Sequence, residues 1–259
     1  MPDFTQPTNF LLTSLFIFLG ISLRYFGIAL LFSLLFGKIF KTKFQHRIVN
    51  TRARRTGQNA KEIAWSLQSA AIFTAITMCI IVAFQLGFTR IYSDFSAHSY
   101  TYFFLSILGV LLIHETYYYW LHRLMHHPKV YKYVHKAHHD SITTSAYTSF
   151  SFHPIESLLQ AIIIPVLTLI LPLHLYAIGC VTLIMTITSV INHLNIELYP
   201  KKMHTHWLGK WFIGATHHSL HHSQYLYNYG LYFTFWDKIM HTESEKYHEL
   251  FEQKTTKKA

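Results

Sequence analysis

The sequence contains few charged side chains and almost no cysteine. Only 13% of its 259 residues are charged and only 12 are Asp or Glu, whereas 17% are aromatic. Soluble proteins ordinarily carry about 25% charged residues. The two cysteines, Cys79 and Cys180, lie singly inside apolar runs. Their placement argues against a disulfide framework, a CxxC metal site and a cysteine-ligated iron–sulfur centre, and we expect both to be small buried apolar residues.

The sequence contains several long apolar runs with few charged residues. Residues 10–37 are interrupted only by Arg24 and exceed the roughly 20 residues that a membrane helix needs. Arg24 either faces the bundle interior or divides this run into two half-length segments. The run has no basic start and no small-residue cleavage site, so we do not expect a removable signal peptide. Further runs at 63–89 and 100–121 predict two more spans.

A last apolar pair, Leu158–Leu171 and Leu175–Ile191, is interrupted by Pro165 and Pro172. It predicts a helical hairpin that crosses the bilayer either fully or only partway. The fold class that follows is all-α, an integral membrane helical bundle.

The net charge of +10 is concentrated in loops, and the loop at 38–62 alone holds eight Lys or Arg residues. This pattern indicates cytoplasmic loops beside anionic lipid rather than a nucleic-acid-binding surface. With the 38–62 loop in the cytoplasm, the next two spans return the chain to the same side near residue 122, and the hairpin returns it there again near His193. We therefore expect every histidine cluster on the cytoplasmic face.

Histidine is the residue in excess, with 20 copies. Three bursts stand out: "HETYYYWLHRLMHH" at 114–127, "HKAHHD" at 135–140 and "HHSLHH" at 217–222. Histidines four apart, or three and four apart, share one face of a helix. Eight histidines have this spacing: His122, His126, His135, His138, His139, His218, His221 and His222. Ordinary zinc sites use three or four protein ligands, so eight imidazoles suit two metals side by side. Imidazole binds iron, copper, zinc and nickel, and ligand type alone does not choose among them. We expect the four isolated histidines to be hydrogen-bonded core residues. They are His46, His98, His174 and His248.

The boxes "HRLMHH", "HKAHH" and "HHSLHH" resemble those of the fatty acid hydroxylase/sterol desaturase superfamily, membrane-bound non-haem di-iron oxygenases. The segments "SFHPIE" at 151–156, "NHLNIE" at 192–197, "YNYG" at 227–230 and "FWDKIMHT" at 235–242 resemble the family as well. The resemblance covers about 105–242. Soluble di-iron proteins instead use two Glu-x-x-His pairs, and this chain has one such spacing, Glu245–His248.

The resemblance implies a set of metal ligands and a set of supporting residues. The metal ligands that it implies are His122, His126, His127, His135, His138, His139, His193, His218, His221 and His222. Residues that either bind metal or support a ligand are His114, His153, His217, Glu115, Asp140 and Asp237. Glu156 belongs with the carboxylates expected to accept imidazole N–H groups.

The resemblance further implies that two irons activate O2 and remove hydrogen from an unactivated C–H bond of a lipid: a sterol, a fatty acyl chain or an ether lipid. Zinc is a competitor for such a site. Electrons would come from an external donor, such as a cytochrome b5-like or ferredoxin-type protein. We expect transmembrane helices and a basic loop in 1–100, a catalytic region in 101–245 and a polar basic tail in 246–259. A membrane metal-binding or metal-transport protein is the alternative.

Overall fold

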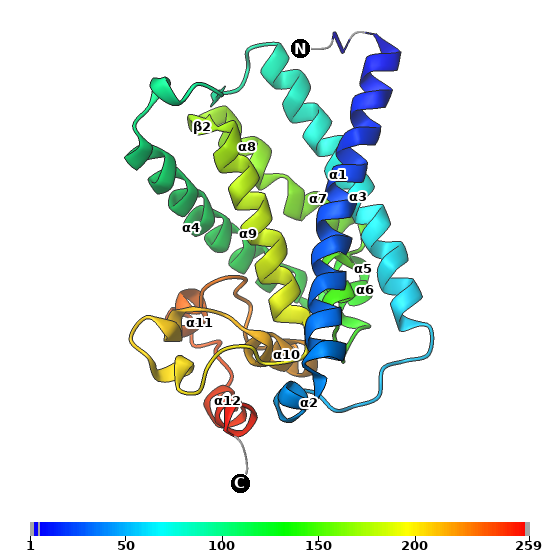
Figure 1. The fold of residues 1–259 in the computed structure, drawn as a ribbon, viewed down its shortest axis with the longest axis vertical. Coiled ribbons are helices and arrows are strands. Elements are labelled where there is room, and N and C mark those ends of the chain that lie inside the picture. The colour runs from blue at the N-terminus through cyan, green and yellow to red at the C-terminus, as the bar shows by residue number, and fades with distance from the viewer. Residues whose placement is uncertain (1–2, 5, 257–259) are drawn as a thin grey trace.

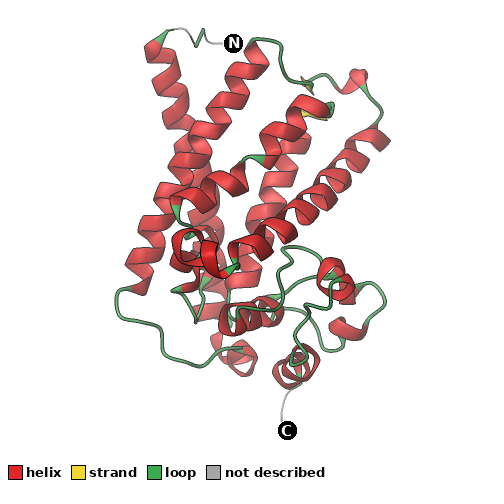
Figure 2. Cartoon of the chain, turned by 180° about the vertical axis from the view of Figure 1, so that it is seen from behind, coloured by secondary structure: helices red, strands yellow, loops and turns green. Residues whose placement is uncertain are grey.

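A computed structural model describes residues 3, 4 and 6–256. Long tilted helices stand on a layer of short helices and loops (Figures 1 and 2). The helices are α1 Pro7–Leu34, α2 Lys41–Phe44, α3 Gln58–Gln85, α4 Tyr100–Met125, α5 Pro128–Val134, α6 Lys136–His139, α7 Pro154–Ala161, α8 Ile163–Ile170, α9 Leu175–His193, α10 Ala215–Gln224, α11 Phe235–Ile239 and α12 Tyr247–Thr255.

Shorter elements join these helices. A π-helical turn, Leu35–Ile39, continues α1. The 3-10 turns are Gln45–Arg47, Phe95–Ala97, Ala146–Phe150, Met203–Thr205 and Gly209–Trp211. Two strands of two residues each, β1 Ile91–Tyr92 and β2 Leu173–His174, pair in parallel. They tie the loop between α3 and α4 to the hairpin between α8 and α9.

Four helices are long and apolar enough to cross a membrane: Pro7–Ile39, Gln58–Gln85, Tyr100–Met125 and Leu175–His193. The predicted all-α membrane bundle is thereby confirmed. The first arm of the predicted hairpin is shorter, because α7 and α8 together cover Pro154–Ile170. At 1.5 Å per residue, 17 residues reach about 25 Å, less than the roughly 30 Å hydrocarbon core. Cys79 and Cys180 are exposed rather than buried, because they lie on the outer faces of α3 and α9.

Polar contacts inside the bundle fix how the spans meet. The Arg24 guanidinium donates to Thr182 Oγ1 on α9 at 2.8 Å, so Arg24 faces a neighbouring helix within one continuous α1. The Tyr25 hydroxyl lies 3.0 Å from Ser66 Oγ on α3 and donates to the carbonyl of Tyr147 at 2.6 Å. In the membrane these groups have no water to bind, so such contacts select one packing of the helices.

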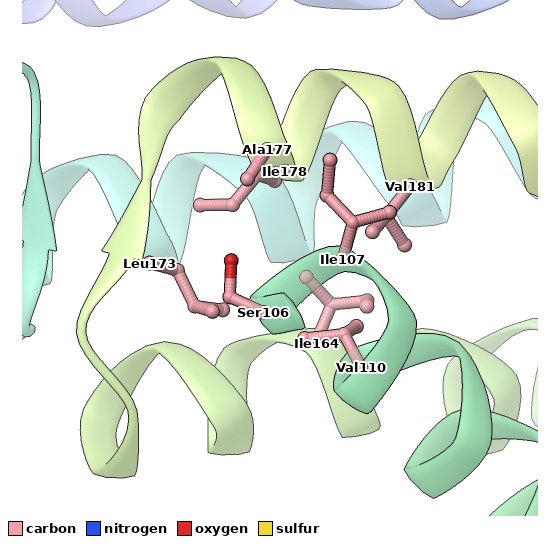
Figure 3. Close-up of a pocket in the computed structure, with 8 residues that line it drawn as sticks. All are labelled: Ser106, Ile107, Val110, Ile164, Leu173, Ala177, Ile178 and Val181. Atoms are coloured by element: carbon pink, nitrogen blue, oxygen red, sulfur yellow. The ribbon is translucent and has the colours of Figure 1, made fainter. Parts of the chain in front are cut away.

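An apolar cluster joins α4, α8 and α9, with Val110, Leu167 and Val181 among its members. It encloses a small cavity of about 10 Å³ between Ser106 and Leu173 (Figure 3). This cavity is near the end of the bundle where β2 lies, away from the histidine-bearing layer at the other end.

Helix starts explain several histidines. His174 caps α9, and its Nε2 lies 3.1 Å from the Ser93 carbonyl, which confirms it as a buried hydrogen-bonded residue. His46, His98 and His248 are exposed, so the same expectation was wrong for them. Each lies in a loop or on an outer helix surface, outside the packed interior.

Candidate metal centre

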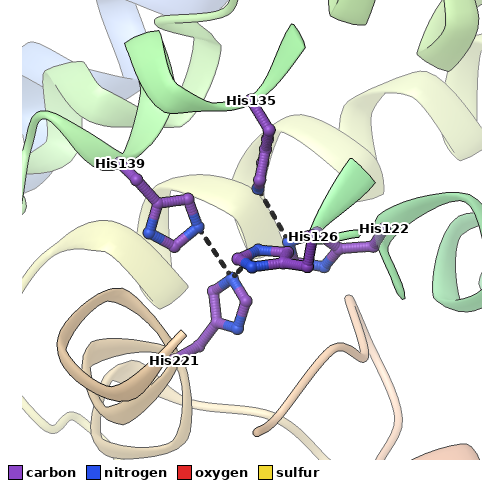
Figure 4. A group of neighbouring side chains, drawn as sticks. All are labelled: His122, His126, His135, His139 and His221. Atoms are coloured by element: carbon purple, nitrogen blue, oxygen red, sulfur yellow. Dashed lines mark hydrogen bonds between the residues drawn. The ribbon is translucent and has the colours of Figure 1, made fainter. Parts of the chain in front are cut away.

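Nine buried histidines meet at one end of the bundle in two groups. The first group is His122, His126, His135, His139 and His221, and the second is His138, His193, His218 and His222. Within each group the candidate ligand atoms lie within 4.8 Å of one another. The rings of the first group point toward a common centre (Figure 4). All nine side chains are buried, with His126 the most exposed at 9%.

Four parts of the chain deliver these rings. His122 lies in the last turn of α4 and His126 is its C-cap. His135 and α6 supply the second box, α10 supplies the third, and His193 ends α9. In the second and third boxes, histidines four apart enter one group and the remaining histidine enters the other. At about 100° per residue, the side chain at i+3 lies about 60° short of a full turn and the side chain at i+4 about 40° past it. The two therefore point in different directions, which is enough for one of them to reach a second centre beside the first.

The hydrogen bonds of the other ring nitrogen fix the tautomers. The Nδ1–H of His122 donates to the Tyr229 carbonyl at 2.8 Å, and that of His135 donates to the Glu156 carboxylate at 2.8 Å. Each ring therefore presents a bare Nε2 lone pair, yet the two Nε2 atoms lie 3.0 Å apart. Neither atom has a proton to donate. Two lone pairs face each other at this distance, and a cation between them would relieve the repulsion.

The second group repeats this arrangement. His138 donates through Nδ1 to the Ser151 carbonyl at 3.2 Å, and His193 donates to the Ser189 carbonyl at 2.7 Å. Their Nε2 atoms then lie 3.2 Å apart. Within the described residues, Nδ1 of His139, His218 and His222 has no hydrogen-bond partner. The donor set, nitrogen only and buried, fits two transition-metal ions.

Burial also sets the charge of these rings. Desolvation, followed by the proximity of other histidines, holds the pKa well below its ordinary value for His135, His138, His139, His218, His221 and His222. These imidazoles are consequently neutral near pH 7, which is the form that binds a metal.

Two buried carboxylates support the site through the backbone of residues 229–233. Asp237 accepts from the N–H groups of Tyr229 and Gly230 at 2.8 and 2.9 Å. Glu115 accepts from the N–H groups of Leu231 and Tyr232, at 3.1 and 2.7 Å. Together they fix the Tyr229 carbonyl against His122. Burial raises the pKa of Asp237 to about 6.

Other predicted site residues lie apart from both groups. His127 is exposed and caps α5, and His153 caps α7; each accepts from an N–H two residues later. His114 Nδ1 lies 3.0 Å from the Tyr232 hydroxyl. His217 is buried, with Nε2 3.8 Å from Asp237, and burial lowers its pKa to about 3.

Asp140 is half-exposed and pairs with Lys136 at 2.9 Å. Within the described residues its carboxylate has no hydrogen bond or ion pair with a histidine. Glu156 has the role that was expected of the carboxylates. The carbonyls that orient His122, His138 and His193 were not found from the sequence, and neither was the Tyr227 carbonyl, 2.7 Å from His221 Nδ1. Every residue carries a carbonyl, and nothing in the sequence marks these four.

A membrane bundle with two buried groups of histidines that could each hold a metal defines a narrow class of proteins, and comparison with known proteins agrees. Residues 107–242 match the family model described as fatty acid hydroxylase. The match covers more than half of the chain, so the chain belongs to the fatty acid hydroxylase family.

Three curated proteins illustrate the relationship. The chain is 29% identical over 199 residues to lathosterol oxidase from Homo sapiens, covering 76% of this chain and 64% of that protein. It is 27% identical over 215 residues to Delta(7)-sterol 5(6)-desaturase ERG3B from Gibberella zeae, covering 82% and 64%. It is 29% identical over 149 residues to methylsterol monooxygenase 1 from Danio rerio, covering 58% and 50%.

The chain thus spans less than two thirds of the length of these relatives. No solved structure matches it.

Proposed function

We propose that this protein is a membrane-bound, O2-dependent di-iron oxygenase that hydroxylates or desaturates an unactivated C–H bond of a lipid. The observation that carries the proposal is the pair of buried histidine groups with Nε2 atoms turned toward one another. The names of the relatives make a sterol the first lipid to test, ahead of a fatty acyl chain or an ether lipid. In this proposal 101–245 is the catalytic region, 1–100 holds the anchoring spans and 246–259 is a tail.

The nine histidines of the two groups are the proposed ligands. His127 has no place in the set, because its ring is exposed and caps α5. Bound irons would supply O2 activation and the oxidising power to break a C–H bond. Imidazole also binds zinc well, so purified protein can carry zinc without that being its working metal.

The residues of the chain have three tasks in such a reaction. Buried carbonyls and Glu156 orient the imidazoles through Nδ1. Tyr118 and Phe152, whose ring centroids lie 5.0 Å from His122 and 5.1 Å from His138, exclude water beside the metals. The apolar cluster between α4, α8 and α9 includes Tyr118, so a lipid tail that enters between the spans would reach the site along an apolar surface.

Topology and electron supply complete the proposal. The basic loop at 38–62 and the histidine layer lie at the same end of the bundle (Figure 1). The positive-inside rule assigns that end to the cytoplasm. A soluble or peripheral donor, cytochrome b5-like or ferredoxin-type, would deliver electrons there. The ligands are grouped at one end instead of following a path across the membrane, which favours an enzyme over a metal transporter.

The test begins with metal content. Detergent-purified protein expressed with iron should contain close to two metals per chain, and a variant with His135→Ala, His138→Ala and His139→Ala should lose both. Parent and variant are then incubated in membranes with sterol, fatty acyl and ether lipids, O2 and a reducing system, and the products are identified by mass spectrometry. Folded parent protein that binds no metal would contradict the proposal. Vesicle metal uptake without lipid oxidation would favour the transporter alternative.

A further inference from the structure

A loop at the histidine end exposes large apolar side chains next to lysines. In this 201–211 loop, Trp207 is 74% exposed, Leu208 47% and Trp211 37%. Lys201, Lys202 and Lys210 lie on the same loop. The surrounding sequence from 198 to 236 contains no Asp or Glu. Tryptophan is rarely this exposed to water, because it loses a large favourable burial of its ring.

The loop is held in one shape, so this exposure belongs to the fold. His206 Nδ1 accepts from the N–H groups of Leu208 and Gly209 at 3.3 and 3.2 Å. A side chain at Gly209 would meet the Met203 sulfur at 2.5 Å, so the turn is closely packed on its inner side. Thr234 ties the far end down: its N–H donates to the Trp211 carbonyl at 3.0 Å.

A neighbouring contact joins the segment that follows the loop to span α4. The Trp236 indole N–H, two residues after Thr234, donates to Thr116 Oγ1 on α4 at 3.1 Å. Thr116 precedes the last residue of α4, Met125, by nine positions, or about 13 Å of helix axis. The segment tied to the loop therefore packs against the later turns of α4, inside a helix that is long and apolar enough to cross a membrane. In Figure 1, α11 lies level with the lower end of α9. The exposed face of α11 adds Ile239, 61% exposed.

We propose that the 201–211 loop is an interfacial anchor that binds the anionic phospholipid surface of the bilayer crossed by the four spans. Trp207 and Leu208 lie below the headgroups, where an indole keeps its N–H near water and its ring in apolar surroundings. The three lysines contact lipid phosphates and anionic headgroups. The 198–236 sequence holds no carboxylate, and Glu252 of α12, which reaches the loop, lies 3.5 Å from His204 and is paired with that imidazole. The continuity of the loop with α4 and α11 selects this bilayer as its partner. The inference is independent of the proposed catalytic function.

The test measures the depth of position 207 in a membrane. The full chain with Cys79→Ser, Cys180→Ser and Trp207→Cys is labelled with a nitroxide and placed in nanodiscs of phosphatidylcholine and phosphatidylserine. The accessibility of the label to O2 and to a water-soluble nickel chelate is then compared. Two controls bracket the scale: native Cys180, on the outer face of span α9, and Glu249→Cys on the exposed side of α12.

We expect the label at 207 to be shielded from the nickel chelate and accessible to O2, closer to Cys180 than to Glu249→Cys. A label at 207 that matches Glu249→Cys would overturn the anchor. Nanodiscs of phosphatidylcholine alone, and a Lys201→Gln, Lys202→Gln, Lys210→Gln variant, should each raise nickel accessibility at 207. Unchanged accessibility in both would overturn the role of the anionic headgroups. Because the readout is spectroscopic, it does not depend on catalytic activity, and a thermal melt verifies the fold of each variant.

Discussion

Replacing Glu156 tests whether the carboxylate supports metal binding. Its Oε1 accepts the His135 Nδ1–H at 2.8 Å, and both side chains are fully buried. Glu156→Gln keeps the shape and leaves an amide oxygen to accept the same N–H. The substitution removes the negative charge that makes His135 a stronger metal ligand. It also puts an amide NH2 group at the position of Oε2, an atom that has no hydrogen-bond partner among the described residues of the parent protein.

The expected loss of metal affinity follows from the position of Glu156, which contacts one proposed metal ligand, His135. A carboxylate behind a metal-bound imidazole is worth about 10–100-fold in metal affinity, which corresponds to about 1.4–2.7 kcal/mol. Both side chains are fully buried, so bulk solvent does not compensate the lost charge. The effect should fall on the first group, which contains His135, while the second group keeps its own carbonyl-oriented rings.

The assay is a metal titration of metal-free protein in detergent against a chromophoric chelator. In Glu156→Gln it should resolve one metal equivalent that binds as tightly as in the parent and one that binds more weakly. Asp140→Asn is the matched control: it removes a carboxylate beside the second box, but one that is half-exposed and paired with Lys136. Parent-like binding by Glu156→Gln, or a loss in Asp140→Asn as large as that in Glu156→Gln, would refute this account of the site.

Three further predictions follow from the same geometry. Metal-free protein should lose stability as the pH falls below about 6.5, since an unfolded chain protonates there while the buried histidines stay neutral; each histidine contributes about 1.4 kcal/mol per pH unit. Thermal melts with and without metal at pH 7.5 and 5.5 measure this, and equal melting of the metal-free protein at both would contradict it. His127→Ala should leave metal content unchanged and cost about 1 kcal/mol of stability through the lost cap of α5, measured by metal analysis and denaturation; a lost metal would return His127 to the ligand set. Asp237→Asn should loosen residues 229 and 230 and destabilise the fold by about 1–3 kcal/mol, with weaker metal binding through His122; unchanged unfolding would show that the carboxylate is dispensable.

The spans and the convergence of the histidine boxes were predictable because both depend on local sequence. Hydropathy identifies a membrane helix without knowledge of its neighbours. Counting spans then places 122, 135 and 218 at one end. His193 needed more than spacing, since it stands alone in its segment and came from the resemblance to the family.

The division of the boxes between the two groups was not predictable. A spacing of three or four residues indicates a shared helix face, whereas His135 and His138, three residues apart, enter different groups. That outcome depends on how α6 and α10 are rotated against each other, which tertiary packing decides. Asp140 and Glu156 show the same limit, because the carboxylate nearest in sequence to the second box is the one that faces solvent.

The sequence did contain a signal against His127 and His153 as ligands. Each stands immediately before a proline, Pro128 and Pro154. Proline favours the first position of a helix, and the residue before it then occupies the cap. Both imidazoles indeed accept from N–H groups of the helix that follows. A neutral histidine that accepts at Nδ1 in this way carries its proton on Nε2, the atom that His122 and His135 leave bare.

The division of the boxes has a consequence for the spacing of the two metals. His138 and His139 are neighbours in the chain and serve different groups, and His221 and His222 do the same. Adjacent Cα atoms are 3.8 Å apart whatever the surrounding helices do. In the proposed two-metal site, one peptide bond therefore links the two groups at His138–His139 and another at His221–His222, so the two metal positions are joined by the backbone as well as by packing. Helices that shift to admit a lipid would carry both metals together as a unit.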